Sequence, residues 1–329
     1  AEAAPKPAQV IPVVTAPPAE APAAPRAEAA SAAPAVPAPA GAGFAAETEI
    51  KMIVEPKILN NICITAHPLG CKKEVENQIN YVKSQPKIKS NVKNALILGA
   101  SGGYGLASRI AIAYGLGAKT IGVSFEKPAT ERRTATPGWY NNEAFSEFAK
   151  KDGIKEKTLI LDAFLNASKE EVIKEAKSFF DGKIDLFIYS LAAPVRMDEK
   201  TGILYRSTLK PIGKTYNGMG IDFMTEELLS VSIEPANEED IKNTIKVMGG
   251  EDWQLWTDAL INADMLSKNA INIAYSYIGP EMTKAVYRDG TIGKAKDDLE
   301  KTAHDLDKKM QEKIKGHAYV SVNKAVVTR

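Results

Sequence analysis

Short apolar runs that alternate with stretches of helical periodicity dominate the chain from about residue 94 onward. The first run, residues 94–98, leads into a glycine-rich segment at 99–105, and residues 106–114 then place apolar side chains at helical spacing. An apolar run, a group of glycines and a helical pattern are how a strand, a tight turn and a helix follow one another in sequence. The segment therefore predicts a βα unit whose turn is built from glycines.

The same alternation recurs further along the chain. Strand-like apolar runs occur at residues 119–125, 158–163, 184–190 and 270–276. Strands that alternate with helical segments indicate βαβ units and a parallel sheet with helices on both faces. We predict an α/β fold with a Rossmann-like, doubly wound parallel sheet.

Other patterns surround this predicted sheet. Two β-prone runs at residues 50–54 and 62–65 predict an N-terminal hairpin, and residues 74–83 predict an amphipathic helix. From residue 195 to about 232 the alternation breaks. Scattered glycines and prolines there predict a long, irregular insertion near the functional site.

Helical patterns resume after the insertion. Residues 237–247 predict a helix with Asn237 at its N-cap and acidic residues in its first turn. Residues 253–265 predict a second helix. Trp253 and Trp256 lie three positions apart on one face of it, so we expect them to pack in the core rather than to contact a substrate.

Residues 1–48 differ in composition from the rest of the chain. Ala and Pro make up about two-thirds of the first forty residues; proline stiffens such a segment, and alanine offers too little apolar area for a core. We predict a disordered linker or tail ahead of a folded domain at residues 49–329. Tracts of this kind tether domains in multidomain enzymes, so an upstream neighbouring domain, a cloning addition and a plain tail stay open as interpretations.

Composition argues against several classes of protein. With 329 residues, a net charge of +1 and 25% charged residues, the chain has no electrostatic reason to bind nucleic acid or a membrane surface. No window approaches the roughly 18 uninterrupted apolar residues of a membrane span. The two cysteines, Cys63 and Cys71, cannot build a disulfide framework, so we expect a reducing compartment. We expect a cytoplasmic monomer with no nucleic-acid partner and no membrane span.

The spacing of Cys63, His67 and Cys71, with three residues between neighbours, raises the question of a metal site. No fourth ligand lies nearby, and Pro68 and Gly70 mark a turn. Structural zinc sites almost always have four protein ligands. We therefore predict no metal centre.

The glycines of segment 99–105 suit a ligand that carries phosphates. Gly99, Gly103 and Gly105 follow the order Gly-x3-Gly-x-Gly. With this spacing the chain can turn sharply, let a pyrophosphate approach the backbone and point free N–H groups of the helix start at it. An ordinary tight βα turn is the alternative, because a glycine-rich turn alone is a weak signal.

The residues beyond the turn point to a dinucleotide. Glu126 ends the second strand about twenty residues after the glycines, where a carboxylate accepts hydrogen bonds from the adenine ribose hydroxyls and repels a 2′-phosphate. This position favours NADH over NADPH. The alternative is that Glu126 is a solvated loop residue whose repulsion of a 2′-phosphate is offset by Lys127. Asp162 and Ala163 would lie beside the adenine, and the small residues 191–194 lie where the cofactor must cross the sheet.

The catalytic pair of short-chain dehydrogenases is absent in its usual form. Those enzymes place a lysine four positions after a tyrosine on a helix, where the ammonium lowers the pKa of the phenol. None of the eleven tyrosines here has a lysine at that offset. Tyr287 is instead followed by Lys296, and two glycines between them allow a bend that could bring the pair together.

Several motifs together resemble one enzyme family. In chain order, from about Met52 to Arg329, the sequence is similar to the trans-2-enoyl-CoA reductases, also called FabV-type enoyl-ACP reductases. The resemblance implies a short-chain dehydrogenase-like version of the predicted sheet. The motifs that carry it are residues 67–71, 136–142, 189–194, 247–253 and 275–280 and the pair Tyr287 and Lys296.

The resemblance implies a reaction and a set of site residues. The reaction is the NADH-dependent reduction of the C2=C3 double bond of a trans-2-enoyl thioester, carried on CoA or acyl carrier protein, in fatty acid synthesis. Tyr287 would be the proton donor, Tyr277 a substrate contact and Lys296 a catalytic residue that contacts the cofactor. The implied NADH site comprises Gly99, Ala100, Ser101, Gly102, Gly103, Tyr104, Gly105, Phe125, Glu126, Asp162, Ala163, Leu191, Ala192, Lys296, Val326, Val327 and Thr328.

The chemistry calls for these residue types. Hydride addition to C3 collects negative charge on the thioester oxygen, and a phenol aimed at that oxygen stabilises it by about 3 kcal/mol. Tyr277 could supply a second hydrogen bond, and Lys296 would hold the ribose and act electrostatically on the tyrosine. Lys294 is the rival of Lys296, and Tyr275 could simply face the core.

Alternatives remain at the level of the whole protein. Family members continue beyond the equivalent of Arg329 with helices that cover the substrate cleft, so the resemblance implies that the C-terminal part of the family fold is absent here. A fragment and a chain completed by another polypeptide are the two interpretations. The competing functions are a carbonyl-reducing short-chain dehydrogenase with displaced catalytic residues and an inactive nucleotide-binding fragment.

Overall fold

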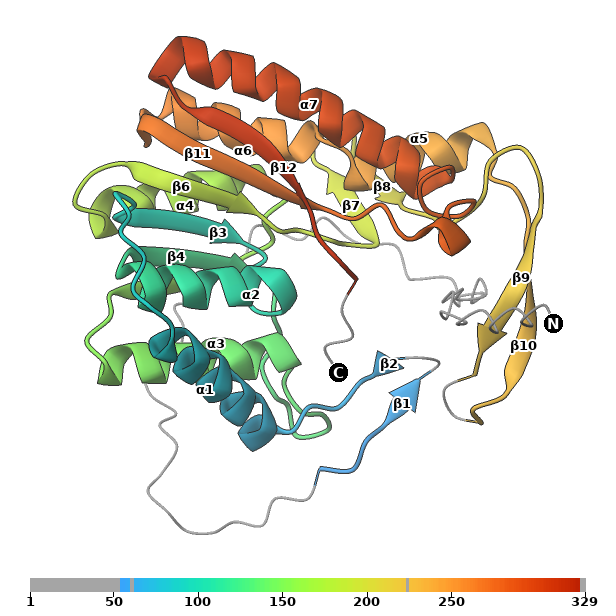
Figure 1. Ribbon diagram of the computed structural model, residues 1–329, viewed down its shortest axis with the longest axis horizontal. Coiled ribbons are helices and arrows are strands. Elements are labelled where there is room, and N and C mark those ends of the chain that lie inside the picture. Colours follow the sequence, from blue (N-terminus) through green and yellow to red (C-terminus); the bar gives the residue numbers. More distant parts are fainter. Residues whose placement is uncertain (1–53, 60–61, 223–224, 326–329) are drawn as a thin grey trace, which may run out of the picture.

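A six-stranded parallel sheet organises the computed structural model, which describes residues 54–59, 62–222 and 225–325 (Figure 1). The strand order is β12-β11-β6-β3-β4-β5, and every neighbouring pair is parallel. Counted along the chain from the β5 edge, this is the order 3-2-1-4-5-6 of dinucleotide-binding sheets, which confirms the predicted Rossmann-like α/β fold. The strands are β3 (Asn94–Leu98), β4 (Lys119–Ser124), β5 (Glu156–Ile160), β6 (Ile184–Tyr189), β11 (Leu266–Ser276) and β12 (His317–Val322).

Helices cover the sheet in two groups, and α2 continues directly into a π-helical turn, η1. The first group packs together through Val75, Leu106 and Phe145, and the second packs on the sheet through Val172, Trp256 and other residues. The first group is α1 (Pro68–Ser84), α2 (Gly103–Ile110), η1 (Ala111–Leu116) and α3 (Pro137–Lys151); the second is α4 (Asn166–Phe179), α6 (Glu251–Asn262) and α7 (Thr291–Ile314), with α5 (Glu238–Met248) against α7.

The central strand β3 shows why the sheet has two covered faces. All five of its residues are buried. Leu96 and Leu98 belong to the cluster that includes α4, α6 and α7, whereas Ala95 and Ile97 belong to the cluster that includes η1. A strand buried on both faces is a continuous apolar run in sequence, which is why this run was recognisable without a structure.

The third predicted strand is displaced, and Arg109 explains the displacement. β5 spans Glu156–Ile160 rather than 158–163. The buried Arg109 of α2 donates hydrogen bonds from Nη2 to Glu156 Oε2 at 2.5 Å and to the Lys157 carbonyl oxygen at 2.8 Å. Burial lowers the pKa of the Arg109 guanidinium to about 10. The polar residues at the start of β5 therefore serve a buried cation, and their polarity concealed the strand.

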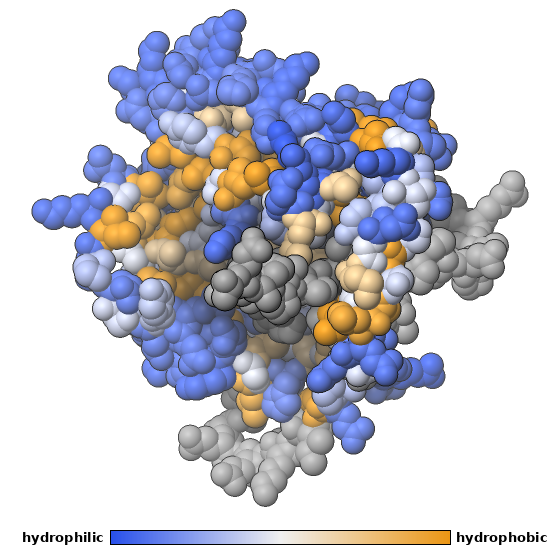
Figure 2. All heavy atoms as spheres, turned by 45° about the vertical axis from the view of Figure 1, so that its right-hand side comes forward, coloured by the Kyte–Doolittle hydropathy of each residue, from blue (hydrophilic) through white to orange (hydrophobic). Residues whose placement is uncertain are grey.

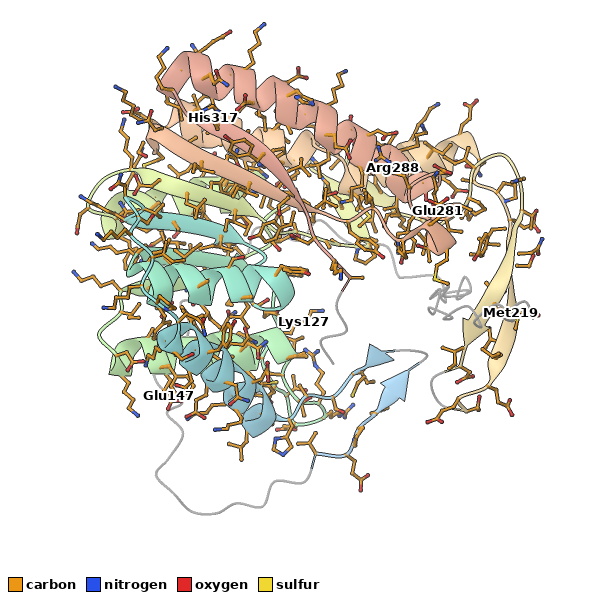
Figure 3. The ribbon with its side chains drawn as sticks, viewed as in Figure 1. Lys127, Glu147, Met219, Glu281, Arg288 and His317 are labelled. Carbon is orange, nitrogen blue, oxygen red and sulfur yellow. The ribbon has the colours of Figure 1, made fainter. Side chains whose placement is uncertain are left out.

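The insertion after β6 lies where it was predicted, but the prediction that it is irregular is wrong. β7 (Val195–Asp198) pairs antiparallel with β8 (Ile203–Arg206), and β9 (Tyr216–Ile221) pairs antiparallel with β10 (Leu228–Ile233). Glycines within β9 weaken the strand signal. The second hairpin extends away from the sheet and carries Met219 (Figure 3).

The predicted N-terminal hairpin is confirmed for its second strand. β2 (Ile62–Cys63) pairs antiparallel with β1 (Ile58–Leu59), so the first strand lies closer to β2 than the predicted run 50–54. Residues 50–53 of that run lie outside the described residues. A shorter connection costs less loop-closure entropy, which favours pairing of the nearer run.

Helix ends follow their capping residues. α1 begins at Pro68 rather than at residue 74, because Nδ1 of His67 accepts a hydrogen bond from the Gly70 N–H at 3.2 Å and caps the helix. The predicted N-cap of α5 is confirmed. Asn237 Oδ1 accepts from the Asp240 N–H at 2.8 Å, and the Asp240 carboxylate accepts from the Asn237 N–H at 3.2 Å.

The two tryptophans of α6 are core residues, as predicted. Both are fully buried. Trp253 donates from Nε1 to Asn272 Oδ1 at 2.7 Å, and Trp256 donates from Nε1 to the Ala163 carbonyl oxygen at 2.9 Å. These hydrogen bonds connect α6 to β11 and to the chain just beyond β5, so the tryptophans also hold one end of the sheet in place.

Edge strand β12 was not predicted. It follows α7, pairs with β11 and is only half-buried, so its apolar pattern is weak. It returns residues 323–325 to the end of the sheet where the other strands finish. The predicted linker or tail, residues 1–48, lies outside the described residues.

Residues 54–59, 62–222 and 225–325 contain neither a membrane-spanning helix nor a cluster of metal ligands. No helix in them is both long and apolar enough to cross a membrane. No group of three or more His, Cys, Asp or Glu side chains in the same ranges is arranged to hold a metal ion.

Candidate active site

A cleft of about 1010 Å³ opens at the carboxyl ends of the sheet strands. It is lined by the glycine turn after β3, by the residues that follow β4, β5, β6 and β11, and by residues 323–325. In doubly wound sheets, ligands bind at this end, where the strand order reverses between the first and fourth strands. Figure 2 turns this side of the molecule toward the reader and shows apolar surface exposed on it.

The glycine turn depends on close backbone contacts. A Cβ on Gly99 would lie 2.0 Å from the Ser190 carbonyl oxygen, and a Cβ on Gly105 would lie 2.0 Å from the Gly99 carbonyl oxygen. Gly99 and Gly103 also have positive φ angles of 76° and 51°. A Cβ on Gly102 or Gly103, by contrast, would meet no atom within 4 Å. The turn is therefore tight on its inner side and open on the side where a ligand would approach.

The start of α2 suits an anion. The helix begins at Gly103, and Gly102 supplies no side-chain cap. The first N–H groups of a helix have no partner within the helix, and the dipole adds positive potential there. The open turn and this helix start together fit a pyrophosphate.

Glu126 lies in the cleft just after β4, held by two hydroxyl groups. Ser101 Oγ donates to Glu126 Oε1 at 2.5 Å, and Thr136 Oγ1 donates to Glu126 Oε2. Phe125 lies beside it and is 66% exposed. A fixed carboxylate at the end of the second strand is the feature that recognises the adenine ribose hydroxyls in this type of sheet.

The structure places most of the implied cofactor residues on the cleft wall, including Asp162, Ala163, Leu191 and Ala192. Ala100 and Gly105 do not line the cleft. Ala100 is fully buried and its N–H donates to the Val123 carbonyl oxygen at 3.1 Å, whereas Gly105 packs against Gly99. Val326, Val327 and Thr328 lie outside the described residues.

Tyr277 and Tyr287 meet in the same cleft. Their rings are in edge-to-face contact, with centroids 5.3 Å apart and planes at 87°. Burial raises the pKa of the Tyr287 phenol above its usual value of about 10, and the neighbouring Tyr277 raises it further. Burial also raises the pKa of Tyr277. Both phenols are therefore neutral near pH 7 and able to donate a proton.

The cleft contains Lys296 and not its rival Lys294. Lys296 lines the cleft, has no hydrogen bond or ion pair with any described residue, and has a pKa lowered by burial. Lys294 is exposed and pairs with Asp297 at 3.4 Å. The chain bends between Tyr287 and α7, as expected. It packs so closely there that a Cβ on Gly293 would lie 1.8 Å from the Arg288 carbonyl oxygen. The glycine lets the start of α7 pack against the turn that carries Tyr287.

Tyr275 faces the cleft as well as the core. Its hydroxyl lies 2.5 Å from Ser108 Oγ, and its ring is in edge-to-face contact with Tyr104 at 6.1 Å. The Tyr104 hydroxyl donates to the Lys324 carbonyl oxygen at 2.8 Å. These contacts fasten the segment after β12 to the glycine turn. Sequence reasoning did not place residues 323–325 on the cleft wall, because it did not predict β12.

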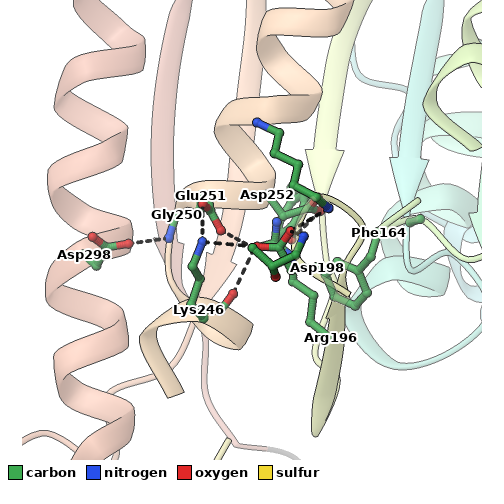
Figure 4. A network of polar contacts seen from close by, with 12 residues as sticks. Phe164, Arg196, Asp198, Lys246, Gly250, Glu251, Asp252 and Asp298 are labelled. Atoms are coloured by element: carbon green, nitrogen blue, oxygen red, sulfur yellow. Dashed lines mark hydrogen bonds and ion pairs between the residues drawn. The ribbon is translucent and has the colours of Figure 1, made fainter. Parts of the chain in front are cut away.

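Sequence reasoning also missed a buried ionic cluster that includes Asp252, which is labelled in Figure 4. Lys169 Nζ lies 3.0 Å from Asp252 Oδ1, and the Tyr189 hydroxyl donates to Asp252 Oδ2 at 3.0 Å. The same ammonium donates to the carbonyl oxygens of Ala163 and Phe164, both at 3.2 Å. The cluster therefore fixes the backbone of the cleft wall that follows β5. Lys169 and Asp252 are 83 positions apart in sequence and Tyr189 and Asp252 are 63 apart, so no local sequence pattern indicates the cluster.

Further apolar residues line the cleft beyond Tyr287. Leu209 comes from the insertion, Met248 from the end of α5 and Ile292 from the first turn of α7. They provide an apolar wall in the cleft that also contains the two phenols. Isolated apolar positions in an insertion carry no recognisable motif, so sequence reasoning did not assign them.

Comparisons with known proteins identify the family. The model of the trans-2-enoyl-CoA reductase catalytic region matches residues 133–329, and that of the NAD(P)H binding domain of trans-2-enoyl-CoA reductase matches residues 53–131. A protein of Brachyspira hyodysenteriae named trans-2-enoyl-CoA reductase [NADH] is 86% identical over 84% of this chain and 71% of its own length. One of Flavobacterium johnsoniae, named enoyl-[acyl-carrier-protein] reductase [NADH], is 54% identical over 84% of this chain and 69% of its own length.

Solved structures give the same result. The trans-2-enoyl-CoA reductase of Clostridium acetobutulicum in complex with NADH is 50% identical, with a TM-score of 0.81 over 84% of this chain and 70% of that chain. The enzyme of Treponema denticola in complex with NAD is 53% identical, with a TM-score of 0.78 and the same coverage. The family resemblance inferred from the motifs is confirmed, and the chain belongs to the trans-2-enoyl-CoA reductase family.

Proposed function

We propose that this chain catalyses the NADH-dependent reduction of the C2=C3 double bond of a trans-2-enoyl thioester, carried on CoA or acyl carrier protein, in fatty acid synthesis. The observation that carries the proposal is that the glycine turn, Glu126 and the Tyr277–Tyr287 pair share one cleft. The names of the relatives from Brachyspira hyodysenteriae and Flavobacterium johnsoniae support both thioester carriers.

The residues of the cleft fit a dinucleotide. The open side of the glycine turn would hold the pyrophosphate, Glu126 the adenine ribose, and Lys296 the ribose next to the nicotinamide. The nearby chain at Asp162, Ala163, Leu191 and Ala192 would flank the rings. When bound, NADH supplies the hydride that is added to C3 of the substrate.

Tyr287 has the properties required of the proton donor. Its phenol stays protonated because burial raises its pKa. It would donate a hydrogen bond to the thioester oxygen, where negative charge develops, and would supply the proton that completes the reduction. Tyr277 would orient the thioester, and the apolar wall at Leu209, Met248 and Ile292 would receive the acyl chain.

A single assay tests the proposal. The purified chain is mixed with crotonyl-CoA and either NADH or NADPH, and the loss of reduced cofactor is followed by absorbance. We expect turnover with crotonyl-CoA and NADH. Turnover of acetoacetyl-CoA instead would favour a carbonyl reductase, and binding of NADH without turnover of either substrate would favour a nucleotide-binding scaffold.

Glu126→Gln tests the cofactor assignment. The change removes the negative charge that opposes a 2′-phosphate, so we expect the ratio of kcat/KM for NADPH to that for NADH to rise by about tenfold or more, the effect of one close charge pair at the protein surface. Turnover measured with each cofactor at saturating crotonyl-CoA gives the ratio. A wild-type enzyme that already uses NADPH as well as NADH would contradict the role given to Glu126.

Two glycine variants test the turn. In Gly105→Ala the new Cβ would lie 2.0 Å from a backbone oxygen. The turn must therefore move, and we expect a loss of about 1–3 kcal/mol of stability together with weak NADH binding.

In Gly102→Ala the Cβ points into open space, so we expect an unchanged Tm and a raised Kd for NADH. Thermal melts and fluorescence titration measure both, and an unchanged Kd in Gly102→Ala would place the pyrophosphate elsewhere.

We also infer that the chain acts in the cytoplasm as a monomer, and that residues 1–48 are an Ala/Pro-rich linker or tail ahead of the reductase domain, residues 49–329. The low cysteine content supports a reducing compartment, and the Ala/Pro composition supports a linker or tail. Light scattering after gel filtration would give the molar mass in solution. A dimer mass would contradict the first inference.

A further inference from the structure

We infer that Thr136 and Gly138, at the start of α3, are specificity-determining positioning residues, because they fix the Glu126 carboxylate in the orientation that admits NADH and disfavours NADPH. The inference rests on the proposed NADH-dependent function. It assigns a role to the motif at residues 136–142, which otherwise contributes nothing to the proposed chemistry.

Thr136 is held in place by hydrogen bonds to the backbone of Lys127. Its N–H donates to the Lys127 carbonyl oxygen at 3.0 Å, and its Oγ1 accepts from the Lys127 N–H at 3.1 Å. Its hydroxyl donates to Glu126 Oε2, and the Lys127 carbonyl oxygen, at 3.4 Å, is a second acceptor for the same hydroxyl. Thr136, the N-cap of α3, is thus hydrogen-bonded both to the backbone of Lys127 and to the Glu126 carboxylate, and only its hydroxyl contacts the carboxylate.

Gly138 leaves the space that the carboxylate fills. It is buried, and a Cβ there would lie 2.1 Å from Glu126 Oε1 and 2.7 Å from Ser101 Oγ. No non-glycine residue can therefore occupy position 138 while the carboxylate stays where it is. The nearest atoms belong to the end of a flexible side chain and not to the backbone. A larger residue would consequently displace the carboxylate rather than the fold.

The same turn of α3 also fixes the glycine turn. Asn141 Nδ2 donates to the Ser101 carbonyl oxygen at 2.9 Å, and both residues are buried. Ser101 in turn donates from its hydroxyl to Glu126 at 2.5 Å. The phosphate-binding turn and the ribose-binding carboxylate are therefore aligned by one short segment of helix.

This arrangement explains how a single glutamate can discriminate between the two cofactors. An ionised carboxylate offers about four acceptor positions, of which the two hydroxyls occupy two, so acceptor capacity remains for a ribose diol. With both oxygens held, the carboxylate cannot rotate away from a 2′-phosphate. If it could, the adjacent Lys127, which is exposed (Figure 3), would be free to attract the phosphate.

Direct binding measurements test this inference. The dissociation constants of NADH and NADPH are measured by quenching of tryptophan fluorescence for the wild type and for Gly138→Ala, Thr136→Val, Thr136→Ser and Glu126→Gln. Gly115→Ala serves as the matched glycine control, because a Cβ there would meet only Val82 Cγ1 at an ordinary 3.4 Å. A thermal melt of each variant reports whether it is folded.

We expect Gly138→Ala and Thr136→Val to lower the ratio of the NADPH Kd to the NADH Kd by about tenfold, as Glu126→Gln does, because each releases or removes one close negative charge. Thr136→Ser keeps the hydroxyl and should keep the wild-type ratio, as should Gly115→Ala. Thr136→Val carries the test if Gly138→Ala fails to fold.

Two results would overturn the inference. One is a wild-type ratio in folded Gly138→Ala and Thr136→Val when Glu126→Gln has lowered it. The other is an unchanged ratio in Glu126→Gln itself, since the carboxylate would then not read the ribose. Failure of the proposed function is distinguishable from both, because it would appear as normal cofactor binding without turnover of crotonyl-CoA.

Discussion

Tyr287→Phe is expected to lower kcat for crotonyl-CoA by about 100- to 1000-fold, the usual cost of removing one hydrogen-bond donor from a developing oxyanion. The change removes the hydroxyl and keeps the ring, so the edge-to-face contact with Tyr277 remains. The Kd for NADH should stay near its wild-type value. Steady-state kinetics with crotonyl-CoA and a fluorescence titration with NADH measure the two effects separately.

Two other tyrosines serve as controls for this prediction. Tyr277→Phe should raise KM more than it lowers kcat, because Tyr277 is assigned to orienting the thioester. Tyr319→Phe, on β12 and 49% exposed, should behave as the wild type. A Tyr287→Phe enzyme with wild-type kcat would show that another group donates the proton.

The pH dependence follows from the same environment. Burial raises the pKa of Tyr287, so its phenol stays neutral at every pH below about 10. Loss of its proton should therefore not lower kcat within that range, and a decline would begin only at higher pH. A kcat that already falls between about pH 7 and 9, in a folded enzyme, would contradict the assignment.

Lys169→Met is expected to destabilise the fold by about 3–5 kcal/mol, because it leaves a buried charge without its partner. Lys169 and Asp252 are 5% and 2% exposed and lie 3.0 Å apart. The ammonium also satisfies the carbonyl oxygens of Ala163 and Phe164. Urea unfolding monitored by tryptophan fluorescence measures the change in the free energy of unfolding.

A double variant and an exposed pair separate the buried charge from other effects. Lys169→Met combined with Asp252→Asn should recover part of the lost stability, because the charge is removed while Tyr189 keeps an acceptor. Lys309→Met, at an ion pair with side chains 38% and 29% exposed, should cost only about 0–1 kcal/mol. If Lys169→Met and Lys309→Met lost equal free energies of unfolding, burial of the Lys169–Asp252 pair would have no effect on its contribution to stability.

The loss in Lys169→Met should also depend on pH. Burial raises the pKa of Asp252 even with Lys169 present, and the ammonium opposes that rise. Without the ammonium the folded state holds the Asp252 proton to still higher pH, while the unfolded state releases it near pH 4. The stability of this variant should therefore fall, relative to the wild type, as pH increases above about 4.

Local sequence patterns were sufficient for the elements around β3. A strand buried on both faces, a turn crowded against its own backbone and a helix with one apolar face each impose their residue types over a few neighbouring positions. The glycine turn, the acidic residue after β4 and the capped start of α5 were therefore recognisable. The irregularly spaced Tyr287 and Lys296 became interpretable only through the family resemblance.

Other features required the tertiary structure because they depend on residues far apart in the chain. Lys169 contacts Asp252 across 83 positions, and Arg109 draws the polar start of β5 into the interior. The space left at Gly138 has meaning only once the Glu126 carboxylate lies in it. Periodicity reports which side of an element is apolar, whereas the identity of the opposing atoms is decided by packing between elements. The strand order, the two phenols in one cleft and the support of Glu126 are for that reason properties of the folded chain.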